Sequence, residues 1–488
     1  MRFVLLLLVF LVPHLGFAQP QPACRALSGI DATALLNHAA AAIGLAGADG
    51  HALYYVADDV INQNYQSDRQ YPPYLMGMMD HELWFDPATG IERTHMTMKY
   101  PASGRVSEMT AMRNSTQNVI LRGDQAMPAP ESFGSDRMLN PWAAVLDFQN
   151  STVKSVSECE YRGYPRWALE RVGLHGPEWL FLDTKTHVPV KVHREEAHYL
   201  WGQVEVEYLY ATWQQFGEAI LPASTNRVVD GEAEIMRTII AAEVKPLDED
   251  VPMEIDANIP PISTDPPYFL RAIPPDTVQV NDDVYLLTNP GYTEAVAVYN
   301  DTLYVFDATQ GEARAQLDHA LAQSTFGIDA ETSIVLVVTD LAWPHIAGVR
   351  YWVAQGATVV SHTESEAFLR RVMEQEWTRE PDLLEQRRAQ VAFDFVGINA
   401  RTAFAGGRVI LYPIDGVSSE GALNAYLPTA DFLWAGDYIQ SVQSPTLYAA
   451  EVYRAAQREG FAPQRTAAQH MPLTPWATIE ALVGSEQP

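Results

Sequence analysis

One stretch decides the fold of the C-terminal half of the chain: SIVLVVTDLAWPHIAGVR, residues 333–350. Its first part, Ile334 to Val338, is an uninterrupted apolar run with the length of a buried strand. A short turn follows, and helical spacing then continues from His345 to Gln355. A buried strand that leads through a turn into a helix is typical of a layered α/β domain.

Strands and helices alternate on both sides of this stretch. The predicted strands lie at Val284–Leu287, Ala295–Tyr299, Leu303–Phe306, Thr358–Ser361, Val391–Ile398, Val409–Tyr412 and Leu423–Tyr426, and the predicted helices at Ala313–Ala322 and Pro445–Glu459. This order predicts an α/β domain over residues 277–488.

The sequence before this domain has a different period. From His51 to Val244, apolar and polar residues alternate in short runs that end at turn residues, such as His81–Asp86 followed by Pro87–Gly90. Repeated runs of this kind indicate an antiparallel sheet with one covered face. One short helix is predicted from Ile30 to Leu45, with Asp31 as its cap. We therefore predict an antiparallel curved sheet with one helix over residues 24–244.

Between the two predicted domains, residues 245–276 are rich in proline and acidic residues and show no sustained apolar period. That composition predicts a linker. A length of 488 residues agrees with two domains, because single cores stop growing near ~250–300 residues. The net charge of −29 would repel phosphate backbones and anionic membrane surfaces, so nucleic acid is not an expected partner.

The first residues have the pattern of a secretory signal. Arg2 precedes an apolar run from Phe3 to Val12, and the small residues Gly16 and Ala18 follow. We predict a cleaved signal over residues 1–18 and export to the periplasm or the extracellular space; an uncleaved membrane anchor is the alternative. No later stretch reaches the ~20 apolar residues that a spanning helix needs.

Cysteine occurs twice, as Cys24 and Cys159. An oxidising compartment would permit these two residues to form a disulfide. The sequence does not show that their Cα atoms approach closely enough, so two free thiols remain an equal alternative.

The residues after the strand at 334–338 carry a resemblance. Thr339 to Gly348 is similar to a loop of the metallo-β-lactamase superfamily, which reads Thr-His-x-His-x-Asp-His-x-x-Gly. At its four metal-ligand positions this chain has Asp340, Ala342, Pro344 and His345. Only the last of the four family ligands is therefore retained.

Further landmarks of the family follow in the right order. They are Tyr304–Ala308 with a structural aspartate, Gly356–His362 as the next strand, Leu423–Pro428 and Phe432–Asp437 as a hairpin that ends in the metal-bridging Asp437, and His470 at the place of the last ligand. The family's third motif histidine falls at or beside Ser418 and is absent. The resemblance implies an αββα sandwich in which His345, Asp437 and His470 remain as metal ligands.

A second, looser resemblance concerns the N-terminal half. Trp179 to Val190, and later Gly217 to Pro222, are similar to the strands of the curved half-barrel in periplasmic lipoprotein-carrier proteins. That resemblance implies a concave face that could hold an acyl chain. An aromatic-rich inner face that forms ordinary core is the alternative.

Two imidazoles and one carboxylate are enough to hold one Zn or Fe ion, which would lower the pKa of a bound water molecule to near ~7. The first hypothesis is therefore an atypical metal-dependent hydrolase of a small-molecule substrate, with water as the nucleophile. Asp340 would serve as an extra ligand or as a general base. The competing hypothesis is a non-catalytic relative that acts as an exported lipid- or protein-binding module. The sequence lacks the Gly-x-Ser-x-Gly motif and a phosphate-binding loop.

Overall fold

The computed structural model describes residues 24–48, 50–62, 75–100, 104–123, 125–129, 136–247, 251–262, 272–329, 331–416, 419, 421–442 and 447–484. The predicted signal at 1–18 and Ser418 lie outside these residues. Among the helices in the described ranges, none has the length and apolar character needed to cross a membrane.

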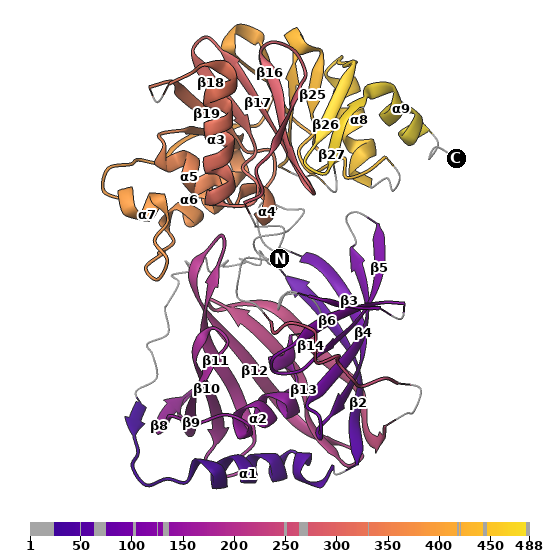
Figure 1. Ribbon diagram of the computed structural model, residues 1–488, viewed down its shortest axis with the longest axis vertical. Coiled ribbons are helices and arrows are strands. Elements are labelled where there is room, and N and C mark those ends of the chain that lie inside the picture. Colours follow the sequence, from indigo (N-terminus) through magenta and orange to yellow (C-terminus); the bar gives the residue numbers. More distant parts are fainter. Residues whose placement is uncertain are drawn as a thin grey trace, which may run out of the picture.

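The N-terminal half forms one 14-stranded antiparallel sheet, as predicted (Figure 1). Its strands are β1 (Cys24–Ala26), β2 (His51–Asn62), β3 (Leu75–Asp86), β4 (Ile91–Tyr100), β5 (Arg105–Arg113), β6 (Asn118–Arg122), β7 (Gln125–Pro128), β8 (Ser155–Tyr161), β9 (Tyr164–Gly173), β10 (Gly176–Asp183), β11 (Pro189–His198), β12 (Gly202–Phe216), β13 (Ala219–Val229) and β14 (Glu232–Pro246). Strands β8 to β14 pair in sequence order, and β14 then pairs with β2, the first strand of the second run.

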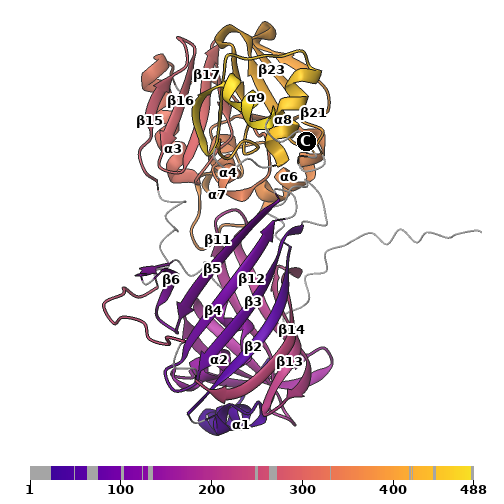
Figure 2. The ribbon, with the colours of Figure 1, turned by 90° about the vertical axis from the view of Figure 1, so that its right-hand side faces the viewer.

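Two helices pack on this strongly curved sheet, where one was predicted. Helix α1 (Ala32–Ala42) begins as expected, because the Asp31 carboxylate accepts hydrogen bonds from the Thr33 and Ala34 amides. Helix α2 (Pro141–Gln149) was missed; the sheet wraps around it, while α1 crosses the end farthest from the C-terminal half (Figures 1 and 2). The prediction of a single helix is therefore wrong.

A disulfide joins Cys24 to Cys159. The two residues are direct partners in the register of β1 and β8, so the sheet itself brings them together. This settles the question that the sequence left open, and it ties the first described strand to an edge of the sheet.

Replacing Cys24 and Cys159 by serine is expected to destabilise the protein by about 2–5 kcal/mol, because the bridge closes a loop of 135 residues in the unfolded chain. Thermal unfolding of the double variant against the oxidised parent measures the loss. A melting temperature equal to that of the parent would contradict this expectation.

The C-terminal half contains two further sheets. The seven-stranded sheet has the order β15 (Asp276–Gln279), β16 (Val284–Asn289), β17 (Tyr292–Tyr299), β18 (Thr302–Phe306), β19 (Ser333–Val337), β20 (Thr358–His362) and β21 (Asp394–Ile398). The six-stranded sheet has the order β22 (Thr402–Phe404), β23 (Val409–Pro413), β24 (Leu423–Leu427), β25 (Phe432–Trp434), β26 (Arg465–Ala468) and β27 (Met471–Pro475). Strands β18 to β21 run parallel, as do β25 and β26.

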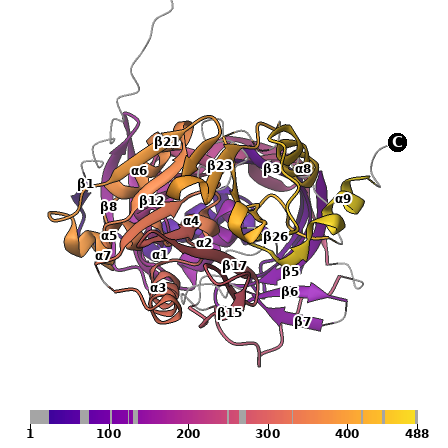
Figure 3. The ribbon, with the colours of Figure 1, turned by 90° about the horizontal axis from the view of Figure 1, so that it is seen from above.

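Both sheets share one core, and helices cover their outer faces. Phe306 of the first sheet and Leu411 and Trp434 of the second belong to a single buried apolar cluster. The helices α3 (Glu312–Phe326), α4 (Trp343–Ile346), α5 (Val349–Ala354), α6 (Glu366–Glu374) and α7 (Leu383–Arg387) lie beside the first sheet, and α8 (Leu447–Arg458) and α9 (Trp476–Gly484) beside the second (Figures 1 and 3). The half is thus layered as helices, sheet, sheet and helices.

The helix predicted from His345 to Gln355 is divided into α4 and α5. Ala347 and Gly348 separate the two helices, and there the Gly348 amide donates to the Ala308 carbonyl at 2.8 Å. A side chain at position 348 would lie only 3.1 Å from that carbonyl. A close tertiary contact therefore breaks a helix whose local pattern is continuous.

Candidate metal centre

The three predicted ligands lie just after strands, at one edge of the two sheets. His345 lies on α4, which follows β19, while Asp437 follows β25 and His470 follows β26. Strands β25 and β26 are parallel, so their carboxyl ends meet at the same edge. The fold thereby brings together residues that are up to 125 positions apart.

The ligand atoms of these residues form a small triangle. The Nε2 atoms of His345 and His470 are 3.3 Å apart, and Asp437 Oδ1 lies 3.3 Å from His470 Nε2 and 3.8 Å from His345 Nε2. Bonds of ~2.0–2.1 Å in a tetrahedral zinc site place neighbouring ligand atoms about 3.3–3.4 Å apart. The triangle therefore has close to the size that one zinc ion requires.

A hydrogen-bond acceptor at the Nδ1 atom of each imidazole also orients the ring. His345 Nδ1 lies 3.1 Å from Asp340 Oδ1, and His470 Nδ1 lies 2.8 Å from the carbonyl oxygen of Gly291. Both acceptors favour the tautomer that carries the proton on Nδ1, which leaves the Nε2 lone pairs facing the centre. This is the arrangement of histidines that bind a metal through Nε2.

The carboxylate of Asp437 is also suited to bind a metal ion. Its Oδ2 accepts a hydrogen bond from Gln440 Nε2 at 3.1 Å, while its buried Oδ1 has no hydrogen-bond partner among the described residues. A buried carboxylate oxygen without a partner is costly. A cation at the centre of the triangle would satisfy it, so the donor set fits a metal ion.

The carboxylates around the triangle favour the protonated form of His345 when no metal ion is bound. Burial alone would lower the pKa of His345, but the carboxylates of Asp437 and Asp340 outweigh it and raise the pKa to about 9. Burial raises the pKa of Asp437, against the opposing effect of the two histidines. A proton and a metal ion therefore compete for the same atoms.

The structure places Asp340 behind the triangle. Its Oδ1 contacts His345 Nδ1 and accepts from the Ala342 amide at 2.9 Å, and its Oδ2 lies 3.4 Å from Gln469 Nε2. The group of converging ligand atoms consists of His345, Asp437 and His470 and does not include Asp340. Its contacts are those of a residue that orients a ligand.

The two other changed positions of the loop at 339–348 add no metal ligand. Ala342 lies at the N-cap of α4, and Pro344 lies within the first turn of that helix. Their side chains have no metal-binding atom. His362, the last residue of β20, accepts a hydrogen bond from the Glu364 amide.

Sequence reasoning missed several supporting residues. Tyr292 packs its ring 5.0 Å from that of His470, and Gly291 and Gln440 hold the outer atoms of His470 and Asp437. Gly436, next to Asp437, has φ of 56° and leaves no room for a side chain beside Thr339. A glycine before the predicted aspartate was the one signal visible in the sequence.

The N-terminal half reaches the metal centre through the turn between β11 and β12. The Tyr199 ring packs at a tilt on Trp343, the residue two positions before His345, with ring centroids 3.9 Å apart. His198 shapes the turn, because its Nδ1 accepts hydrogen bonds from the Leu200 and Trp201 amides. The loop that carries His345 is thus covered by a residue of the other half.

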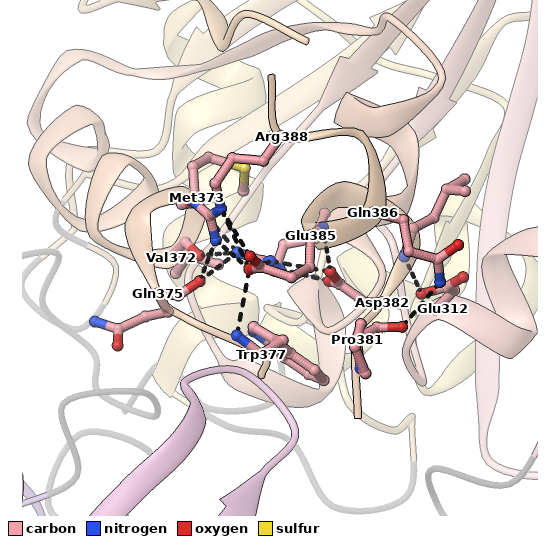
Figure 4. A network of polar contacts seen from close by, with 12 residues as sticks. Glu312, Val372, Met373, Gln375, Trp377, Pro381, Asp382, Glu385, Gln386 and Arg388 are labelled. Carbon is pink, nitrogen blue, oxygen red and sulfur yellow. Dashed lines mark hydrogen bonds and ion pairs between the residues drawn. The ribbon is translucent and has the colours of Figure 1, made fainter. Parts of the chain in front are cut away.

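Neighbouring contacts hold this turn in place. Trp201 is buried against Phe368 and against the guanidinium of Arg371, and the Gln203 amide donates to the Glu376 carbonyl. Behind this segment, Glu385 accepts from the Trp377 amide and pairs with Arg388 (Figure 4). The turn therefore rests on a well-bonded part of the C-terminal half.

Replacing Tyr199 by alanine is expected to weaken zinc binding by roughly tenfold, because the loop with His345 loses its outer support. Tyr199→Phe keeps the aromatic ring and should bind as the parent does. Competition with a chromogenic zinc chelator measures both, and Tyr164→Ala, at an exposed position on β9, is the control. Equal affinities for Tyr199→Ala and the parent would contradict this role.

Comparisons with known proteins give structural neighbours only. No family model matches the chain, and no curated protein matches its sequence. Part of the chain is similar to the DIM-1 metallo-β-lactamase, with 13% identity and a TM-score of 0.33 over 44% of this chain and 97% of that one. TMB-1 is 12% identical, with a TM-score of 0.34 over 43% of this chain and 96% of that one. A metallo-β-lactamase from Pontibacter korlensis is 13% identical, with a TM-score of 0.33 over 44% of this chain and 100% of that one. These likenesses concern the fold of part of the chain.

Proposed function

We propose that this chain is a hydrolase of the metallo-β-lactamase type that uses a single zinc or iron ion held by His345, Asp437 and His470. The observation that carries the proposal is the triangle of ligand atoms, with edges of 3.3, 3.3 and 3.8 Å and a buried carboxylate oxygen that accepts no hydrogen bond from the described residues. When bound, such an ion supplies Lewis acidity and activates water for attack on an acyl group.

The residues around the ion have distinct tasks. Asp340 holds the Nδ1 proton of His345, and Gly291 holds that of His470. The side chain of His470 is 31% exposed, whereas that of His345 is 2% exposed, so a substrate approaches from the side of His470. Gln440 keeps the outer oxygen of Asp437 engaged, which leaves the inner one free.

The N-terminal half supports a structural role better than an acyl-chain site. The inner face of its sheet packs on α2 and contains the buried ion pair of Arg237 with Asp59, and Arg137 pairs with Asp147 of α2. Buried charges are costly in contact with an acyl chain. We therefore do not extend the proposal to a lipid.

The disulfide between Cys24 and Cys159 supports the proposed export, because such bonds persist in oxidising compartments.

The function is tested by metal content and hydrolysis together. Purified protein should contain one equivalent of zinc or iron and should hydrolyse some members of a panel of esters, thioesters and lactams, and a chelator should remove both properties. His470→Ala should lose the metal, whereas His362→Ala should keep it. Metal-free protein that takes up no zinc or iron on reconstitution would refute the hydrolase and leave the non-catalytic binding module.

Replacing Asp340 by asparagine is expected to lower zinc affinity by about 10–100-fold, because the carboxylate that orients His345 is lost while all three ligands remain. Zinc competition titration measures the change. Asp282→Asn, which alters an exposed carboxylate, is the matched control. A change equal to that of the control would show that Asp340 does not orient the ligand.

A further inference from the structure

Methionine is concentrated in one part of the N-terminal sheet. Seven of the 14 methionines lie within residues 76–112, namely Met76, Met78, Met79, Met96, Met98, Met109 and Met112. Four of them, Met79, Met96, Met98 and Met109, form a separate apolar cluster with Ile61 and Ala111. We call these four residues the methionine cluster. Because methionine makes up only 14 of the 488 residues, four of them in one cluster is a marked local concentration.

Strand pairing places the methionine cluster and His81 on one face of the sheet. Met79 of β3 is the direct partner of Met98 of β4, His81 is the partner of Met96, and Met96 is in turn the partner of Met109 of β5. The three strands lie side by side (Figure 2). Direct partners have Cβ atoms about 4.5–5.5 Å apart, and residues two apart on one strand share a face. The long, flexible thioether side chains can therefore reach the imidazole of His81 and one another.

His81 is buried without a hydrogen bond. It is 2% exposed, and neither ring nitrogen has a hydrogen-bond partner among the described residues. Its Nδ1 lies 3.6 Å from Asp59 Oδ2, and that carboxylate is itself held by Arg237. Burial and the nearby Arg237 lower the pKa of His81 to about 3, so the ring stays neutral and keeps a lone pair.

These features point to a ligand. An imidazole nitrogen buried without a partner costs free energy that ordinary packing does not return. A soft cation bound to Nε2 would remove that cost, while the carboxylate of Asp59 lies on the side of Nδ1, where it can orient the ring. Thioether sulfur selects Cu(I) among biological metals, and imidazole also binds copper.

We propose that His81 and the methionine cluster form a Cu(I) site inside the N-terminal sheet, separate from the candidate metal centre. Met98 and Met109 are only half-buried, so the ion enters from their side. The site binds the reduced ion and involves no electron transfer. It is independent of the proposed hydrolase, because no residue is shared between the two sites.

The test is withdrawal of Cu(I) from its bicinchoninate complex, without oxygen and with ascorbate, which leaves the Cys24–Cys159 disulfide intact. It is done on the His345→Ala, His470→Ala variant, so that the other centre contributes no ligand. One equivalent of Cu(I) should transfer to the protein. Met96→Leu with Met109→Leu should weaken binding at least tenfold, whereas Met138→Leu, a buried methionine elsewhere in the sheet domain, should not change it.

A second measurement does not depend on the folding of a variant. Silver(I), a redox-inert ion of the same class, is titrated into protein with isotope-labelled methionine methyl groups. Shifts of the methyl resonances of the methionine cluster at one equivalent would support the site. No transfer of Cu(I), equal binding by the leucine variant, or shifts confined to other methionines would overturn it.

Discussion

Replacing His345 by alanine is expected to abolish stoichiometric zinc binding. His345 supplies one of three converging donors and is the least exposed of them, so no water molecule can replace it without rearrangement. Loss of an orienting residue typically costs 10–100-fold in affinity, and loss of the ligand itself should cost more than about 100-fold. The Asp340 carboxylate would also lose its contact with the imidazole, although it keeps the hydrogen bond from the Ala342 amide.

The matched control is His319→Ala, which removes a half-buried histidine bound to Tyr351 on the helical layer. Isothermal titration with zinc distinguishes the two variants. The control should bind one equivalent with the affinity of the parent. Unchanged affinity in His345→Ala would show that the triangle of ligand atoms is not where zinc binds.

The second large effect is a dependence of metal affinity on pH. In the metal-free protein the pKa of His345 is raised to about 9, although burial opposes the shift, so the ring is protonated at neutral pH. Zinc binds only the neutral imidazole, so each pH unit below about 9 should weaken apparent affinity about tenfold, or nearly a thousandfold between pH 9 and pH 6. Burial also raises the pKa of Asp437. Its protonation at the acidic end of this range would weaken zinc binding further.

Zinc titrations buffered at several pH values between 6 and 10 measure this dependence. The affinity should rise with pH and reach a plateau above about pH 9. In Asp340→Asn the plateau should begin at a lower pH, because one of the two carboxylates that raise the pKa of His345 is gone. Affinity that does not vary between pH 7 and pH 9 would contradict the assignment of His345 as a ligand.

The fold was predictable wherever the local pattern agreed with the tertiary structure. The alternating runs of the N-terminal half became strands, and the buried run at 334–338 became β19. Helix α2 escaped prediction because Trp142 to Val145 are buried on every side, and a helix that is apolar all round has no helical period to detect. The break between α4 and α5 was hidden for another reason, since it depends on contact with Ala308.

The residues of the candidate site also include some that the sequence could predict and some that it could not. His345, Asp437 and His470 could be predicted because a family resemblance aligns each with a ligand position. Their supporting groups could not, because Gly291 lies 179 positions from His470 and contributes only a backbone carbonyl oxygen, which accepts from His470 Nδ1. The contact of Tyr199 with Trp343 joins the two halves of the chain, and neither residue carries a pattern that marks it. His81 and its methionine neighbours were likewise visible only through strand register.

Crystals grown with zinc and measured on both sides of the zinc absorption edge would reveal whether the ion binds at the triangle of ligand atoms. We expect one anomalous peak inside the triangle of His345 Nε2, His470 Nε2 and Asp437 Oδ1, at about 2.0–2.2 Å from each atom. A triangle without a peak, in crystals that bind zinc elsewhere or not at all, would contradict it.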